Sequence, residues 1–230
     1  MNKRHEVACA GAGLIGVTLI LVGLIVADYL PPPKANWSTA HFGTFYAGET
    51  HRIRVGVLIM LVAGSGWAAL MAVVTQQLQR SATGGTMAWL NAMAGAAVYI
   101  LLTLFAVFLA AAAFRPNRNP EETQLLHDVG WFMAFLAAPP FVVQALSVGV
   151  GVLSDRGEHP VYPRWLGWLG IWTALLLTPG TILLFFHSGV FAYHGLISYW
   201  IPVFAFGGWM GGMSLAALLH ATKAPAATTA

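Results

Sequence analysis

One apolar stretch decides the fold: residues 55–76 read VGVLIMLVAGSGWAALMAVVTQ, without a charged side chain. A helix needs about 20 such residues to cross the hydrocarbon core of a bilayer. Five further stretches share this length and character, and the loops between them carry the Pro, Gly and charged residues that end helices. The sequence therefore predicts six membrane-spanning helices, at 7–27, 55–76, 87–113, 130–153, 165–186 and 196–220.

The composition supports the same fold class. The chain is 58% hydrophobic and only 8% charged, whereas a soluble domain carries about 25% charged residues. We therefore expect an all-α, polytopic membrane helix bundle, a single domain over residues 1–222 with lipid as its solvent, followed by a disordered tail at 223–230. The net charge of +3 comes from scattered basic residues, so no nucleic-acid partner is expected. The single cysteine, Cys9, excludes an internal disulfide and a cysteine-based metal cluster.

The two chain termini are expected on the cytoplasmic side of a cell inner membrane. Six basic residues lie on that side against five on the other, which agrees with the positive-inside rule. The first apolar segment follows Lys3 and Arg4, so a signal peptide is one interpretation. Its length, and the lack of a following Ala-x-Ala pattern, favour a retained span.

Most ionisable side chains fall in the three loops of the opposite face, at 28–54, 114–129 and 187–194. Arg54, Arg118, Glu121 and Glu122 are interpreted as anchors at helix ends, with Pro120 opening a short helix before span four. Six residues there suggest a function instead: His41, Glu49, Arg52, Asp128, His187 and His194.

These six residues lead to a hypothesis of acid–base chemistry on a small lipophilic molecule that is bound or converted at this face. Glu49 or Asp128 would be the general acid or base, and Arg52 or His187 would stabilise charge. His187 and His194 lie at the ends of two neighbouring spans and are expected to reach one site. No histidine pair has the i, i+4 spacing of a zinc motif, so no metal site is predicted.

Prolines inside the spans predict a cavity. Pro139 and Pro140, Pro179 and Pro202 interrupt spans four, five and six, and a proline removes a helical hydrogen bond. Bent helices leave space between them, so a cavity bounded by spans four to six is expected. Gln144 is expected either to satisfy carbonyl groups freed by the prolines or to face that cavity.

Small and aromatic residues predict how the helices pack. Glycines 207, 208, 211 and 212 form two overlapping Gly-x-x-x-Gly pairs on span six, which indicates close packing within the chain or, as an alternative, a homo-oligomer. Trp165, Trp168 and Trp172 are interpreted as an interfacial belt, with a ligand-stacking wall as the alternative. Tyr193, Tyr199 and Trp200 are interpreted as the belt of the opposite side.

Three stretches resemble a family of uncharacterised six-span bacterial membrane proteins: FYAGETHRIRVG at 45–56, PRWLGWL at 163–169 and FFHSGVFAYHGLI at 185–197. The similarity covers most of the chain and implies the six-span architecture, without an activity.

A shorter stretch, WSTAHFG at 37–43 followed by Gly48, is similar to a segment of styrene oxide isomerase. In that haem-b membrane enzyme a histidine of this segment ligates iron, so the resemblance implies haem b as cofactor and His41 as its axial ligand. That family has four spans, and Ala47 stands where it carries an asparagine beside the haem.

Two other functions remain open. A transporter would need a polar path, for which Asn91, Gln144, Thr178 and Thr181 are the notable mid-span groups, and intramembrane charges are the usual mark of such paths. A non-catalytic subunit of a membrane complex would use the glycine-rich helix faces.

Overall fold

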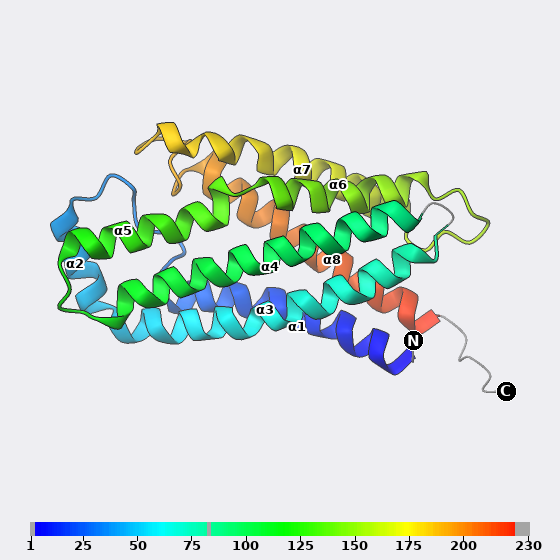
Figure 1. Cartoon of the computed structure of the whole chain (residues 1–230), viewed down its shortest axis with the longest axis horizontal. Helices are drawn as coiled ribbons and strands as arrows, with labels where there is room; N and C mark the ends of the chain where they lie inside the picture. The colour runs from blue at the N-terminus through cyan, green and yellow to red at the C-terminus, as the bar shows by residue number, and fades with distance from the viewer. Residues whose placement is uncertain (1–2, 82–83, 224–230) are drawn as a thin grey trace.

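The computed structural model describes residues 3–81 and 84–223 and is an elongated helical bundle (Figure 1). Its elements are α1 (Lys3–Val26), α2 (Thr39–Gly48), α3 (Thr50–Gln79), α4 (Gly84–Phe114), α5 (Pro120–Trp131), η1 (Phe132–Leu136), α6 (Pro139–Ser154), α7 (Arg164–Leu177), η2 (Thr178–Phe185), η3 (Leu196–Trp200) and α8 (Ile201–Lys223). No strand occurs in these described ranges. Apart from Lys223, the predicted tail at 223–230 lies outside the described ranges.

Six helical segments are long and apolar enough to cross a membrane: Lys3–Val26, Thr50–Gln79, Gly85–Phe114, Pro120–Ser154, Arg164–Phe185 and Leu196–Lys223. The predicted all-α, six-span bundle is therefore confirmed, and the chain is a multi-pass membrane protein. Most of the spans extend past their predicted ends, because a helix that satisfies its own backbone continues beyond the hydrocarbon core that hydropathy detects. The first span consequently includes Glu6.

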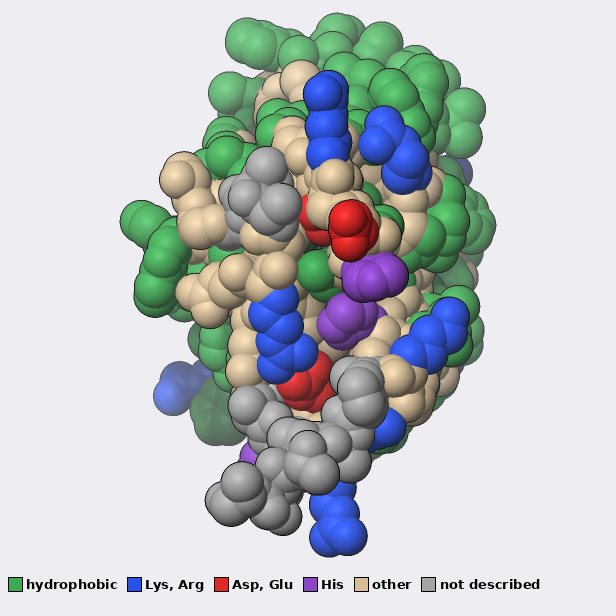
Figure 2. Space-filling view, turned by 90° about the vertical axis from the view of Figure 1, so that its right-hand side faces the viewer, with side chains coloured by type: hydrophobic (Ala, Val, Ile, Leu, Met, Phe, Trp, Pro, Cys, Tyr) green, Lys and Arg blue, Asp and Glu red, His purple; other side chains and the backbone are tan. Residues whose placement is uncertain are grey.

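Polar side chains mark the two ends of the bundle. Figure 2 shows the end that carries the termini, where charged and histidine side chains gather between hydrophobic flanks. We call this the terminal end and the other the loop end. At the loop end, Arg54 donates to the carbonyls of Ala113 and Phe114, at 3.1 and 2.8 Å, and Arg118 donates to that of Ala111 at 2.9 Å. The last carbonyls of a helix lack intrahelical donors, so both arginines are the predicted helix-end anchors, here of α4.

Glycines set the distance between α1 and α3. A Cβ on Gly66 would collide with the carbonyl of Ala12, and one on Gly56 with that of Gly23. The absence of side chains lets the two backbones touch.

The glycines of α8 differ among themselves, and close packing within the chain, the first of the two interpretations, applies to Gly212. Gly212 packs against Leu169 and Trp165, whereas a Cβ on Gly207, Gly208 or Gly211 would meet nothing within 4 Å. The residue pattern does not distinguish these cases, because it does not say which face of α8 another helix covers.

Proline breaks three spans as predicted. A π-helical turn at Phe132–Leu136 precedes α6, which begins at Pro139; the 3-10 segment Thr178–Phe185 follows α7; and the turn Leu196–Trp200 precedes α8. Gln144 takes neither expected role: its amide donates to the sulfur of Met71 and lies against Gly95, and it does not line the cavity described below.

The aromatic residues of the two ends also differ. Trp165, Trp168 and Trp172 are 50–59% exposed, as a lipid-facing belt requires and a ligand-stacking wall does not. Tyr193 and Tyr199, which we predicted to form the opposite belt, are instead buried at 4% and 0% exposure. Each hydroxyl group has a hydrogen-bond partner in the protein, which offsets the free-energy cost of burying it.

Candidate functional site

The six residues singled out from the sequence do not form one site. Arg52 bridges Glu49 at 3.0 Å and Asp28 at 3.5 Å, and these side chains are between one third and about one half exposed. Exposed pairs of this kind contribute about 0–1 kcal/mol. The structure therefore brings Glu49 and Arg52 together as a surface ion-pair network.

Asp128 and His187 lie close together, whereas His194 has other partners. The hydroxyl of Tyr193 donates to Asp128 at 3.2 Å, and the exposed His187 lies close enough to Asp128 for an electrostatic interaction. His194 accepts the backbone N–H of Ala35 on Nδ1 at 3.0 Å, and burial together with Lys34 lowers the pKa of its imidazole. Different partners hold His187 and His194, although one hairpin carries both.

His41 lies on the exposed face of α2, with its ring on that of Trp37 at a centroid distance of 4.0 Å. A haem ligand needs a ring nitrogen that faces a slot wide enough for the macrocycle. His41 instead faces its tryptophan neighbour and the surface, and it does not line the cavity described below. These residues do not fit haem b as the resemblance implies.

The loop end buries a set of polar aromatic side chains that the sequence did not reveal, which we call the aromatic cluster: Tyr29, Tyr46, His127, Trp131, Tyr193 and Tyr199. They come from the loop after α1, from α2, from α5, from the loop before η3 and from η3 itself. His127 and Trp131 are four residues apart on α5 and therefore share one helix face. The hydroxyl of Tyr199 donates to the carbonyl of Tyr29 at 2.6 Å and ties η3 to the first loop.

Hydrogen bonds join three members of the aromatic cluster in a row. The hydroxyls of Tyr29 and Tyr46 are 2.9 Å apart, and that of Tyr46 is 2.8 Å from Nδ1 of His127. Burial raises the pKa of both tyrosines, so the row consists of neutral phenols next to an imidazole. The described residues offer no partner for Nε2 of His127 or Nε1 of Trp131, and both atoms are buried.

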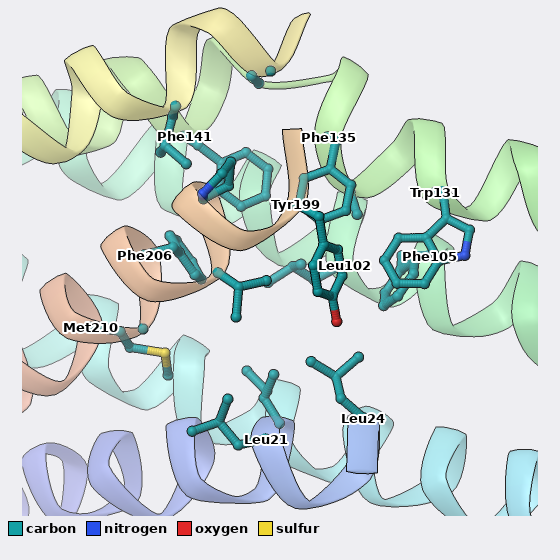
Figure 3. Close-up of a pocket in the computed structure, with 18 of the residues that line it drawn as sticks. Leu21, Leu24, Leu102, Phe105, Trp131, Phe135, Phe141, Tyr199, Phe206 and Met210 are labelled. Carbon is teal, nitrogen blue, oxygen red and sulfur yellow. The ribbon is translucent and has the colours of Figure 1, made fainter. Parts of the chain in front are cut away.

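A cavity of about 110 Å³ lies against this cluster. Trp131 and Tyr199 belong to its wall, together with apolar side chains from α1, α4, η1, α6, α7 and α8; Figure 3 shows Leu21, Leu24, Leu102, Phe105, Phe135, Phe141, Phe206 and Met210 among them. The predicted cavity at the helix breaks is therefore present, and spans one and three complete it. An engineered cavity of about 150 Å³ with a similar lining stays dry and binds benzene, so this one suits a small ring or a short alkyl segment.

The cavity lies where α1 and α8 separate. At the terminal end they touch, since a Cβ on Gly13 would lie 2.5 Å from the hydroxyl of Ser214. Toward the loop end α8 runs away from α1 (Figure 1), and the cavity lining there includes Leu21 and Gly207. Leu21 is 39% exposed to what would be lipid, and Gly207 carries no side chain to cover the gap.

The terminal end holds a second buried polar group that sequence reasoning missed, which we call the Glu6 cluster: Glu6, Gln77, Arg80 and Tyr162. Arg80 bridges Glu6 at 2.6 Å; Gln77 donates to Glu6 at 3.0 Å and accepts from the hydroxyl of Tyr162 at 2.6 Å. Glu6 directly before an apolar run was the available signal, because a carboxylate at that depth requires a partner.

Protein-family models, characterised proteins and solved structures were compared with this chain, and none matches.

Proposed function

We propose that the protein binds a small lipophilic molecule in the cavity between α1, α8 and η1. The main support for this proposal is an apolar cavity of about 110 Å³ that lies where two spans separate, at the boundary with lipid. Such a ligand partitions into the bilayer, so it reaches the cavity from the side, between Leu21 and Gly207. With the N-terminus in the cytoplasm of a bacterial cell, the cavity belongs to the outer half of the inner membrane.

The lining favours binding over acid–base conversion within the cavity itself. Among the described residues of its wall there is no carboxylate, imidazole or amine. The hydroxyl of Tyr199 is already engaged by Tyr29. Any chemistry would have to come from the adjacent aromatic cluster, which contains His127.

Two glycines of α8 provide a matched test. Gly207 borders the cavity and Gly208 does not, yet a side chain at either position would meet open space. Gly207→Leu should therefore fill part of the cavity, and Gly208→Leu should project into lipid. The probe is fluorobenzene, followed by fluorine NMR on the purified protein in micelles.

We expect saturable fluorobenzene binding by wild type and by Gly208→Leu, and at least a tenfold loss in Gly207→Leu. Thermal unfolding checks that both variants fold. Binding that is non-saturable in wild type, or equally weakened by both substitutions, would contradict the proposal.

A further inference from the structure

Two buried nitrogen atoms of the aromatic cluster lack a hydrogen-bond partner, and both lie on one face of α5. Nε2 of His127 and Nε1 of Trp131 are the atoms concerned, on side chains that are 0% and 1% exposed. Leaving a buried polar group unpaired costs about 1–3 kcal/mol. Two such groups one helical turn apart point to a third molecule that satisfies them.

The acceptors available along the hydrogen-bond row favour one tautomer of His127. The hydroxyl of Tyr29 has Tyr46 as its acceptor in the described structure, so its proton points there. Tyr46 then donates its own proton to Nδ1 of His127, and the neutral imidazole keeps its proton on Nε2. The opposite direction would leave the Tyr29 proton without an acceptor in a fully buried position.

Both unpaired groups are therefore donors. The indole N–H has no acceptor capacity, and the imidazole presents its Nε2–H. The ring centroids of His127 and Trp131 are 5.9 Å apart. A single oxygen at about 2.9 Å from each nitrogen serves both donors only when the two nitrogens lie within about 5.8 Å of each other.

Trp131 connects this donor pair to the cavity. Figure 3 shows its six-membered ring toward the other lining residues and its nitrogen on the far side. The ring stacks on Phe135 and on Tyr193, with interplanar angles of 3° and 5°. An apolar body in the cavity and an oxygen at the donor pair thus lie on either side of the same indole.

We propose that His127 and Trp131 form a polar subsite for an acceptor oxygen of the ligand, which makes that ligand a small lipophilic carbonyl compound, alcohol or ether rather than a hydrocarbon. This inference rests on the proposed binding in the cavity. Two N–H donors on one oxygen are also the arrangement that polarises a carbonyl group. A lone water could supply the same oxygen, and the experiment separates these sources.

The test uses two probes of the same shape, 2-hexanone and 2-methyl-1-hexene, in competition with fluorobenzene. Only the ketone has an acceptor oxygen. The ratio of the two affinities is compared between wild type and variants, which cancels the partition of each probe into the micelle. Trp131→Phe removes the N–H and keeps the ring stack.

Trp209→Phe is the matched control. The indole nitrogen of Trp209 is likewise buried without a partner among the described residues, but Trp209 does not line the cavity. We expect the ketone preference to fall about fivefold in Trp131→Phe, the loss of one net hydrogen bond. Trp209→Phe should retain the wild-type ratio, and neither substitution should weaken alkene binding by a similar factor.

Three outcomes would overturn the subsite. An unchanged ratio in Trp131→Phe would mean that the donors hold only a water, and an equal fall in Trp209→Phe would mean a general effect on the fold. The third is an infrared measurement of 2-hexanone bound to wild type: a carbonyl band at the frequency seen in hydrocarbon would show that its oxygen accepts no hydrogen bond. This measurement does not depend on whether Trp131→Phe folds. Failure of both probes and of fluorobenzene to bind would instead refute the cavity as a ligand site.

Discussion

The two ends of the bundle bury polar side chains in opposite ways. At the terminal end the Glu6 cluster contains a full ion pair, and each of its buried side-chain nitrogen and oxygen atoms has a partner. At the loop end the aromatic cluster carries no buried ion pair, and two of its nitrogens are unpartnered. A buried charge whose partners are all present leaves no group open to a ligand, whereas neutral donors left open next to a cavity are suited to one.

The difference also explains why the loop end carries so many charges. Those charges lie at the surface, where Arg52 joins Glu49 and Asp28, and at the end of α4, where Arg54 and Arg118 cap the helix. The polar aromatic side chains that the loop end buries lie beneath these charges and are uncharged groups.

The largest expected effect concerns the ion pair at the terminal end. Arg80→Met leaves the carboxylate of Glu6 buried, with its side chain 5% exposed and without its cation. We expect a loss of about 2–4 kcal/mol in the free energy of unfolding, measured by chemical unfolding in micelles. Arg52→Met is the surface control and should cost under about 0.5 kcal/mol.

The double variant Glu6→Gln/Arg80→Met should recover most of that loss, because no buried charge then remains. Equal costs for Arg80→Met and Arg52→Met would show that the two ends do not differ as described.

Tyr46→Phe tests the hydrogen-bond row of the loop end. It leaves the Tyr29 hydroxyl and Nδ1 of His127 without the partner that joins them. We expect a loss of about 1–3 kcal/mol in the free energy of unfolding. Tyr99→Phe is the control, since the Tyr99 hydroxyl makes no hydrogen bond within the described ranges, and it should change stability by under about 0.5 kcal/mol. Equal losses in the free energy of unfolding for Tyr46→Phe and Tyr99→Phe would show that the hydrogen-bond row does not contribute to stability.

The smallest effect is a pH dependence at the surface of the loop end. His194 accepts the N–H of Ala35, and burial and Lys34 lower the pKa of its imidazole below the ordinary 6.5. The neutral form is thus favoured on folding, so its contribution is complete above pH 6.5 and is lost as the pH falls through the lowered value. We expect a loss of about 0.5–1 kcal/mol over that range.

His194→Asn keeps an acceptor that does not titrate, so its thermal unfolding should lack this acid-induced step. An identical pH profile in both proteins would assign the step to another group.

Hydrophobic length predicted much of this molecule. Each apolar stretch is a helix because an unpaired backbone group in lipid is costly, and that constraint acts on each segment by itself. The prolines predicted the breaks at residues 132–138, 178–185 and 196–200 for the same local reason. The helix-end roles of Arg54 and Arg118 also followed from the sequence.

Most residues of the candidate site could not be predicted from the sequence. Their charge favoured Glu49 and Arg52 as site residues, although both lie at the surface. Tyr46 and Trp131 look like ordinary aromatic residues of a membrane protein, so the sequence does not mark them as site residues. Tyr193 and Tyr199 resemble an interfacial belt, because a sequence does not show that Tyr193 packs on Trp131 or that Tyr199 donates to Tyr29 in the first loop.

The sequence by itself determined the six spans, their breaks and the uneven distribution of charge, since these depend on the solvent and on neighbours within a few residues. The tertiary structure alone decided which polar groups are buried and which of them lack a partner. Hydrogen bonds such as those from Tyr29 to Tyr46 and from Tyr46 to His127 join residues 17 and 81 positions apart, and their geometry depends on how α1, α2 and α5 meet. The cavity likewise exists only because α8 turns away from α1, which is a property of the pair of helices rather than of either one.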